Sequence, residues 1–328
     1  MHTREPRWRG GRSTRRRASG WCTCFTMQRD AMDQDVFTTD RGRLFSIAYR
    51  MLGSASDADD VLQDAWLRYR SVEPSDIRSP VALATTIVTR LCLDRLKSAR
   101  MTREEYIGPW LPEPVLTSDV EDPASKLQRS ESVTLAFLVL LEALSPEERA
   151  VFLLKDVFGY EHTEVADMLG TSPENSRQLL HRAKSRLAKS RPRLTGTAHA
   201  RRAVAERFAR AFAAGDGPAL TALLTADVGL WSDGGGKASA ARRPLAGRDA
   251  VLKFLVGIWR AGQVAGLATQ ATLTIEEINS EPALVLRVSG GLESIFVLST
   301  DGEVVSGIRI IRNPDKLAHV DRRLTTLH

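Results

Sequence analysis

The stretch that decides the fold runs from Glu161 to Lys184 and reads EHTEVADMLGTSPENSRQLLHRAK. A helical stripe of apolar residues ends at Gly170, whose missing side chain permits a sharp turn. After the turn, Ser172 is a preferred N-cap residue and Pro173 is a preferred first residue of a helix. Two short helices joined by such a turn predict a helix-turn-helix.

The second helix of this motif, expected over 173–190, separates an apolar stripe from a polar one. Leu179 or Leu180, together with Ala183 and Leu187, forms the stripe that packs inward. In a DNA-reading helix the outward side chains contact base edges and phosphates in the major groove. A charged, solvated helix of an ordinary bundle is the alternative. The expected DNA contacts are Glu174, Asn175, Arg177, Gln178, His181, Arg182, Lys184 and Arg186.

Three amphipathic helices are predicted upstream, and they form a first helical bundle over residues 35–104. Gly53 ends the first helix, and several aspartates near the start of the second suit the positive end of its dipole. The third helix is apolar in its first half and basic in its second half. These helices are expected over residues 35–52, 57–69 and 81–102, with a loop over 71–80.

A proline-rich linker over residues 105–125 separates this bundle from a second bundle over 126–192. Its prolines favour an extended, semi-rigid chain. The linker carries Trp110 and Leu111, large apolar side chains without a local core, which need a partner surface. The helices of the second bundle are expected over residues 126–143, 146–158, 161–169 and 173–190.

The last part of the chain mixes helices with β-like stretches. It predicts an α+β domain over residues 197–318, followed by a tail over 319–328. Asp301-Gly302 marks a hairpin turn between the last two strands. Helices followed by an antiparallel sheet are typical of a cone or half-barrel. Helices are expected over 198–214 and 248–260, and strands over 227–231, 268–277, 283–289, 292–299 and 303–311.

The formal net charge of +6 lies entirely near the start of the chain. Residues 1–30 contain eight arginines against two acidic residues, so the rest of the chain is neutral overall. Net charge therefore does not indicate nucleic-acid binding, and local clusters have to carry that argument. The segment over residues 1–32 is either a disordered basic arm or an upstream extension whose true start is Met27 or Met32.

Cysteine content and hydropathy limit the class of protein. Cys22, Cys24 and Cys92 are too few for a disulfide framework, and no further metal ligands accompany the C-x-C pair. No apolar run approaches the ~20 residues of a membrane-spanning helix. We therefore expect a soluble, cytoplasmic chain with reduced thiols, no bound metal, no cofactor and no membrane partner.

The segment from Asp57 to Arg68, DADDVLQDAWLR, resembles the second conserved region of the extracytoplasmic-function sigma factors. These proteins direct RNA polymerase to promoters, so core RNA polymerase and promoter DNA are the implied partners. In that family this helix binds the polymerase clamp, and the resemblance assigns the contact to Asp60, Gln63 and Asp64. Asp60 and Asp64 share one helical face and offer acceptors to a basic partner.

The segment over residues 85–97 is similar to the family's helix for the upstream promoter-melting element. The loop over 71–80 would meet an unstacked base of the separated strand. With the helix-turn-helix as the second promoter-reading region, the resemblance covers about residues 35–192. It assigns phosphate contacts to Arg90, Arg95, Lys97 and Arg100.

Three further motifs match a subgroup, the SigJ-type sigma factors with a SnoaL-like extension. They are the linker motif Tyr106–Pro114, the DGGGK motif Asp233–Lys237 and the NPDKL motif Asn313–Leu317. The resemblance implies two all-α bundles followed by an α+β SnoaL-like cone that controls polymerase engagement from within the chain. We expect the two extension motifs to clasp the linker. The residues concerned are Tyr106, Pro109, Trp110, Asp233, Lys237, Asn313, Pro314, Asp315, Lys316 and Leu317.

Two alternatives remain open. The cone fold also hosts isomerases and hydrolases, so Asp227, Trp231 and Asp233 could line a pocket for a small ligand or a reaction. No acid–base pair stands out, and His199 and His319 are expected at the surface, so we expect no enzymatic activity. The whole chain could instead be a helix-turn-helix regulator that never touches polymerase, with an ordinary acidic face on its second helix.

Overall fold

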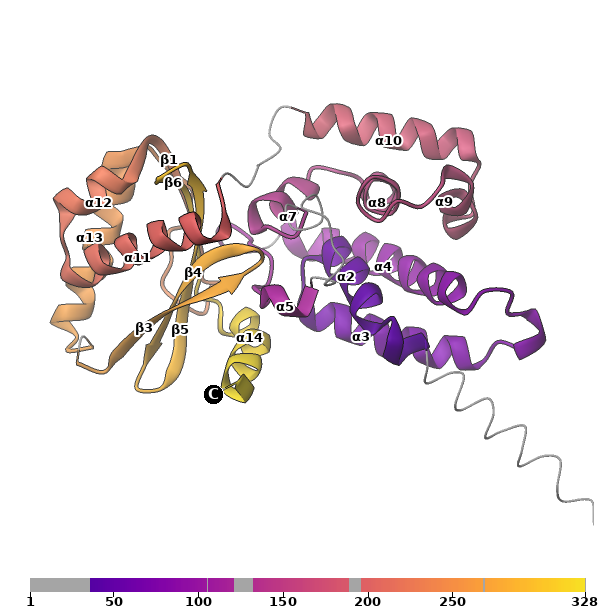
Figure 1. Ribbon diagram of the computed structural model, residues 1–328, viewed down its shortest axis with the longest axis horizontal. Coiled ribbons are helices and arrows are strands. Elements are labelled where there is room, and N and C mark those ends of the chain that lie inside the picture. Colours follow the sequence, from indigo (N-terminus) through magenta and orange to yellow (C-terminus); the bar gives the residue numbers. More distant parts are fainter. Residues whose placement is uncertain (1–35, 105, 121–131, 189–195, 268, 328) are drawn as a thin grey trace, which may run out of the picture.

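The computed structural model describes residues 36–104, 106–120, 132–188, 196–267 and 269–327. Two helical bundles lie at one end of the molecule and a β-sheet domain lies at the other (Figure 1). Three helices lie where the two ends meet: α5 (Thr117–Val120), α7 (Leu135–Leu141) and α14 (Pro314–Leu327).

In the described part of the chain, the first bundle contains three long α-helices, a helical turn over residues 36–39 and a short 3-10 turn. Its first predicted helix is split, because the chain bends at Asp40. Gly53 ends this helix in the left-handed conformation, at φ 68°, where its N–H donates to the carbonyl oxygen of Tyr49. Ser54 caps the next helix, and its hydroxyl accepts from the N–H of Asp57 at 3.1 Å. The elements are α2 (Arg41–Leu52), α3 (Ala55–Arg70), η1 (Pro74–Asp76) and α4 (Pro80–Glu104).

The second bundle contains the helix-turn-helix and the helices that precede it. Of the helix predicted over 126–143, residues 126–131 lie outside the described part of the chain, and α7 is the helix observed. The helix predicted over 146–158 changes to π-helical geometry at Leu153. The elements after α7 are α8 (Pro146–Phe152), η2 (Leu153–Val157), α9 (His162–Leu169) and α10 (Pro173–Leu187).

The two bundles share one apolar core. Leu44 of α2 is buried in the same cluster as Phe137 of α7 and Phe152 of α8. A buried arginine reinforces the contact, because Arg149 of α8 donates to the carbonyl oxygen of Met51 at 2.8 Å. The bundles therefore form one continuous body, in which neither can move away without exposing apolar surface.

The C-terminal domain contains a six-stranded sheet in the order β2-β1-β6-β5-β4-β3. The last four strands form the predicted antiparallel meander, but β1 pairs with β6 in parallel, so the sheet is mixed. A long connection through one helix and four strands makes this parallel pairing possible. The elements are α11 (Ala198–Ala214), α12 (Gly217–Leu223), β1 (Leu224–Asp233), β2 (Leu245–Ala246), α13 (Arg248–Val264), β3 (Ala271–Ile278), β4 (Glu281–Val288), β5 (Gly291–Asp301) and β6 (Val304–Ile311).

The two faces of the sheet are covered by different parts of the chain. Helices α11, α12 and α13 cover one face, where Phe208, Phe212 and Phe296 lie in its core. The opposite face forms a core with residues from outside the domain, namely Leu111 of the linker and Leu135 of α7. The linker and the second bundle thus complete the hydrophobic core of the C-terminal domain.

Helix α14 completes the covering of this second face. Leu317, Val320 and Leu324 of α14 are buried in the same cluster as Leu111. The boundary predicted between residues 318 and 319 is therefore wrong, because one continuous helix runs from Pro314 to Leu327.

We expect Phe137→Ala to lower the free energy of unfolding of both bundles together, by about 3–5 kcal/mol, because it empties a site in their shared core. Denaturant unfolding monitored by the helical circular dichroism signal measures this change. Val264→Ala is the control, since Val264 is 91% exposed and should leave stability unchanged. Independent unfolding of the two bundles would contradict the shared core.

Candidate nucleic-acid and polymerase interfaces

The helix-turn-helix is built from α9 and α10 by local interactions. Gly170 takes the left-handed conformation, at φ 65°, and so turns the chain out of α9. Ser172 caps α10, with its hydroxyl accepting from the N–H of Asn175 at 3.2 Å. Leu179 and Ala183 on the inner side of α10 are buried, which selects Leu179 over Leu180 for the packing stripe.

The outer side of α10 presents the residues expected to contact DNA. Arg177, Gln178, His181 and Arg182 are exposed and line one surface pocket. They offer guanidinium, amide and imidazole groups, which can bond base edges and phosphates. The other expected DNA contacts of α10 are also exposed. They form ion pairs or hydrogen bonds within the bundle: Glu174 with Arg177, Asn175 with Thr171, Lys184 with Asp156, and Arg186 with Glu148.

The basic residues of α4 differ in where they point. Arg90 donates to the carbonyl oxygens of Met168 at 2.9 Å and Asp167 at 3.2 Å, so it binds the end of α9. Lys97 is exposed and lies 3.3 Å from a carboxylate oxygen of Glu147. Arg95 turns toward α3. Arg100 belongs to α4, but its side chain lies outside the described part of the chain.

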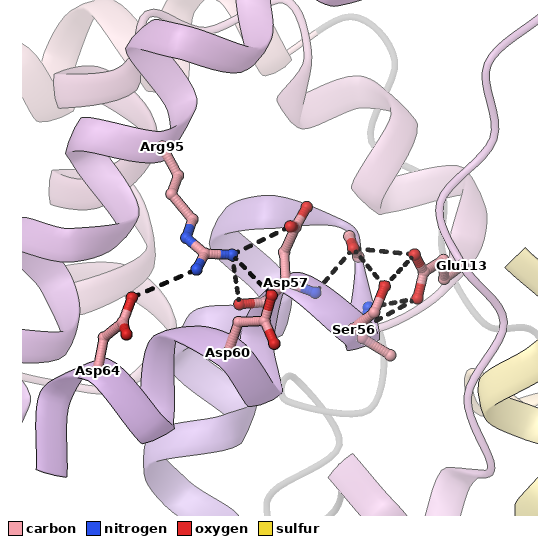
Figure 2. A network of polar contacts seen from close by, with 8 residues as sticks. Ser56, Asp57, Asp60, Asp64, Arg95 and Glu113 are labelled. Atoms are coloured by element: carbon pink, nitrogen blue, oxygen red, sulfur yellow. Dashed lines mark hydrogen bonds and ion pairs between the residues drawn. The ribbon is translucent and has the colours of Figure 1, made fainter. Parts of the chain in front are cut away.

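The acidic face of α3, defined as Asp60, Gln63 and Asp64, is exposed to solvent. Figure 2 shows Arg95 of α4 reaching over this face. Its guanidinium nitrogens lie 3.5 Å from the Asp60 carboxylate and 3.4 Å from that of Asp64. The apolar side chain of Leu67, 55% exposed, follows one turn later on the same side of the helix.

The residues expected to clasp the linker meet around one buried carboxylate. Asp233 is fully buried at the end of β1. One of its oxygens accepts from the Tyr106 hydroxyl at 2.6 Å, and the other accepts from the Leu111 N–H at 2.8 Å. The second oxygen also lies 2.7 Å from the ammonium of Lys316. The carboxylate therefore joins the linker, β1 and α14.

Lys316 and Asn313 complete what we call the clasp, which consists of Tyr106, Trp110, Asp233, Asn313 and Lys316. The Lys316 ammonium lies 4.7 Å from the ring centroid of Tyr106 and 4.5 Å from that of Trp110. The Asn313 amide donates to the Tyr106 hydroxyl at 3.0 Å. Burial raises the pKa of Tyr106 well above its ordinary value, and the Asp233 carboxylate adds to the shift, so this hydroxyl stays a donor.

The other residues expected at the clasp lie at its edge. The exposed pair Lys237 and Asp315 closes it on the solvent side. Leu317 is buried in the core below it, while Pro109 is half-buried and Pro314 is exposed at the first position of α14. The glycines of the DGGGK motif allow the close approach, because a Cβ at Gly235 would lie 2.2 Å from the Asn313 amide nitrogen. The three motifs therefore lie together in the structure, although each contributes differently.

Glu113 of the linker was missing from the expected site residues. It is 7% exposed, and its carboxylate accepts from the backbone N–H groups of Ala55 at 2.8 Å and Ser56 at 3.0 Å. The hydroxyls of Ser54 and Ser56 donate to the same carboxylate, as Figure 2 shows for Ser56. A carboxylate at the positive end of a helix is favoured by both charge and hydrogen bonding. Glu113 therefore fixes the linker to the first turn of α3.

Asn279, in the turn between β3 and β4, was also missed. Its backbone is left-handed, at φ 53°. Its side-chain amide donates to the Tyr49 hydroxyl at 2.7 Å and the Val133 carbonyl at 2.8 Å, and its side-chain oxygen accepts from the Val115 N–H at 3.1 Å. One turn of the C-terminal domain thus binds the first bundle, the linker and the start of the second bundle. The only signal in the sequence was a short polar turn between two strands.

The residues proposed for a ligand pocket or a reaction are not gathered at one site. Asp227 is exposed, Asp233 belongs to the clasp, and the Trp231 ring is covered by the guanidinium of Arg309 at 4.9 Å. His199 is exposed, whereas His319 is half-buried and stacks on Phe45 of α2, so its expected surface position is wrong. Its position follows from α14 being a packed helix.

The described ranges contain no group of three or more His, Cys, Asp or Glu side chains placed to hold a metal ion. Across the same ranges, no helix is both long enough and apolar enough to cross a membrane.

Comparison with known proteins places both helical bundles. The sequence profile of sigma-70 region 2 matches residues 36–102, and that of sigma-70 region 4 matches residues 134–187. The chain is 38% identical to the ECF RNA polymerase sigma factor SigJ of Mycobacterium tuberculosis, over 87% of this chain and 93% of that protein. It is 29% identical to the probable ECF RNA polymerase sigma factor SigI of the same organism, over 84% and 92%. The crystal structure of SigJ matches with a TM-score of 0.68 and 35% identity, over 86% of this chain and 97% of that one.

We expect Glu113→Ala to destabilise the protein by roughly 1–3 kcal/mol, because it leaves buried backbone donors of α3 without an acceptor. Hydrogen exchange at the Ala55 and Ser56 amides should accelerate along with the loss of stability. Glu303→Gln is the control, since its side chain is 89% exposed. Unchanged exchange at these two amides would refute the role given to Glu113.

Proposed function

We propose that this chain, which belongs to the ECF RNA polymerase sigma factors of the SigJ type, binds core RNA polymerase through the acidic face of α3 and promoter DNA through α10 and α4. The observation that carries the proposal is the presence of both elements on one chain. The acidic face is an exposed set of acceptors on a rigid helix, and the outer side of α10 is an exposed set of donors. A DNA-binding regulator alone would need only the second.

Promoter recognition divides between base contacts and phosphate contacts. Arg177 can pair with guanine edges and Gln178 with adenine edges in the major groove. Arg182, Lys184 and Arg186 lie along the same exposed side and suit phosphates, which would make binding depend on salt. Intramolecular ion pairs already hold several of these side chains, so DNA has to compete with Asp156 and Glu148.

The C-terminal domain, in this proposal, regulates the sigma function from within the chain. The clasp ties the linker to β1 and α14, and Glu113 ties the same linker to α3. Helix α14 also lies beside the first bundle, where a His319 ring nitrogen is 3.8 Å from an Asp59 carboxylate oxygen. A displacement of the clasp residues is therefore transmitted, through the linker and α14, to α3, the helix that carries the acidic face.

The contacts of the clasp do not support catalysis by the C-terminal domain. A general base needs a free lone pair near its substrate. The Asp233 carboxylate instead accepts from a hydroxyl, two backbone N–H groups and an ammonium, and the linker fills the space in front of it. These bonds suit a structural role for the carboxylate.

We expect the double substitution Asp60→Arg and Asp64→Arg to abolish capture of core polymerase while the fold is kept. It replaces exposed acceptors with cations that repel a basic partner. Co-purification with core polymerase measures capture, and circular dichroism checks the fold. Asp227→Arg with Asp249→Arg is the charge-matched control on exposed positions of the C-terminal domain. Survival of capture in the first variant would exclude this face as the contact.

We expect Asp233→Asn in the full chain to change promoter-dependent transcription in the same direction as truncation after Thr195. Both remove the Asp233 carboxylate, which accepts from the Tyr106 hydroxyl and the Leu111 N–H of the linker. Run-off transcription with purified core polymerase measures the effect, and Asp227→Asn, on an exposed residue, is the control. Intact-like transcription from both altered chains would rule out regulation by this domain.

A further inference from the structure

Arg95 of α4 is surrounded by carboxylates of α3. One guanidinium nitrogen lies 3.1 Å from an oxygen of Asp57 and 3.5 Å from one of Asp60. The other terminal nitrogen lies 3.4 Å from an oxygen of Asp64. The first nitrogen also donates to the backbone carbonyl of Asp57 at 3.4 Å. Figure 2 shows the side chain reaching across from α4, with its guanidinium between these acids.

This arrangement neutralises charges that would otherwise repel one another. Asp57, Asp60 and Asp64 follow at intervals of three and four residues, so their carboxylates lie on one side of α3. Like charges at this spacing are unfavourable on a helix. A planar guanidinium can serve several carboxylates at once, which the compact ammonium of lysine does less well.

The same contacts draw Arg95 away from a role in DNA binding. Its side chain is 30% exposed, whereas that of Lys97, two residues later, is 58% exposed. The donors of Arg95 point to α3, and those of Lys97 reach one carboxylate at the bundle surface. To bind a phosphate, Arg95 would have to leave three acids unpaired.

We infer that Arg95 sets the affinity of the chain for core polymerase and is not a DNA contact. The inference rests on the proposed binding of polymerase through Asp60 and Asp64. Arg95 is an internal counter-ion that neutralises part of the negative charge of that face. A basic partner must therefore either displace the Arg95 guanidinium or be attracted more weakly to the face. Electrostatic attraction between exposed charges governs association and its salt dependence. Substituting Arg95 should therefore change both the affinity for core polymerase and the dependence of that affinity on salt.

The test measures the Kd of the full chain for purified core polymerase without DNA, at several salt concentrations. Arg95→Gln and Arg95→Met should each lower the Kd about two- to fivefold, as expected for the loss of exposed ion pairs. The salt dependence should become steeper in both. Arg95→Lys should stay near the intact chain, because it keeps the charge. An unchanged or raised Kd in the Gln and Met variants overturns the inference.

Matched variants separate this result from other causes. Lys97→Gln removes a charge from the same helix and should leave the polymerase Kd unchanged while weakening promoter binding by the holoenzyme. Arg202→Gln, on the exposed surface of α11, should change neither measurement. With Asp60→Asn and Asp64→Asn already present, Arg95→Gln should have no further effect, and a persisting gain would overturn the inference. Failure of Asp60→Arg with Asp64→Arg to abolish capture would instead refute the polymerase contact itself.

Discussion

The buried carboxylate of Asp233 constrains the positions of the linker and of helix α14. A fully buried charge is tolerated only when it is paired and hydrogen-bonded. Its partners come from the linker, through Tyr106 and Leu111, and from α14, through Lys316. If the linker were displaced, Asp233 would keep the ammonium but lose a hydroxyl and a backbone donor. The linker and α14 are therefore held in place together.

The linker carries this constraint to the opposite end of the molecule. Asp233 binds an N–H of the linker, and a few residues later Glu113 of the linker binds N–H groups of α3. Trp110, directly before Leu111 in the chain, packs against Gly53, where a Cβ would lie 2.8 Å from its ring. The result is a short, buried path from the C-terminal sheet to the helix with the acidic face. Proline on both sides of Glu113 limits how far this path can stretch without breaking contacts.

Local signals made the helix-turn-helix predictable, and tertiary contacts explain what was missed. Gly170, Ser172 and Pro173 act on their own neighbours, so the turn could be read directly from the sequence. The clasp was found through motifs known from a family, because nothing in the residues themselves shows that Asp233 meets Lys316. Glu113 and Asn279 bind groups that lie far away in the sequence, and no periodicity reports such contacts. The parallel pairing of β1 with β6 also joins segments far apart in the sequence, so it could not be predicted from local patterns.

The basic residues of α4 show how one conformation can hide a function that the sequence suggests. Arg90 and Arg95 lie on a helix expected to hold phosphates, yet Arg90 binds carbonyl oxygens at the end of α9 and Arg95 binds the acids of α3. Hydrogen bonds from a charged donor are among the stronger ones in proteins, so these contacts favour the arrangement in which the bundles share a core. To reach a phosphate, the exposed side chain of Arg90 would have to leave these carbonyl oxygens of α9. DNA binding by Arg90 would therefore compete with the hydrogen bonds that connect α4 to the end of α9.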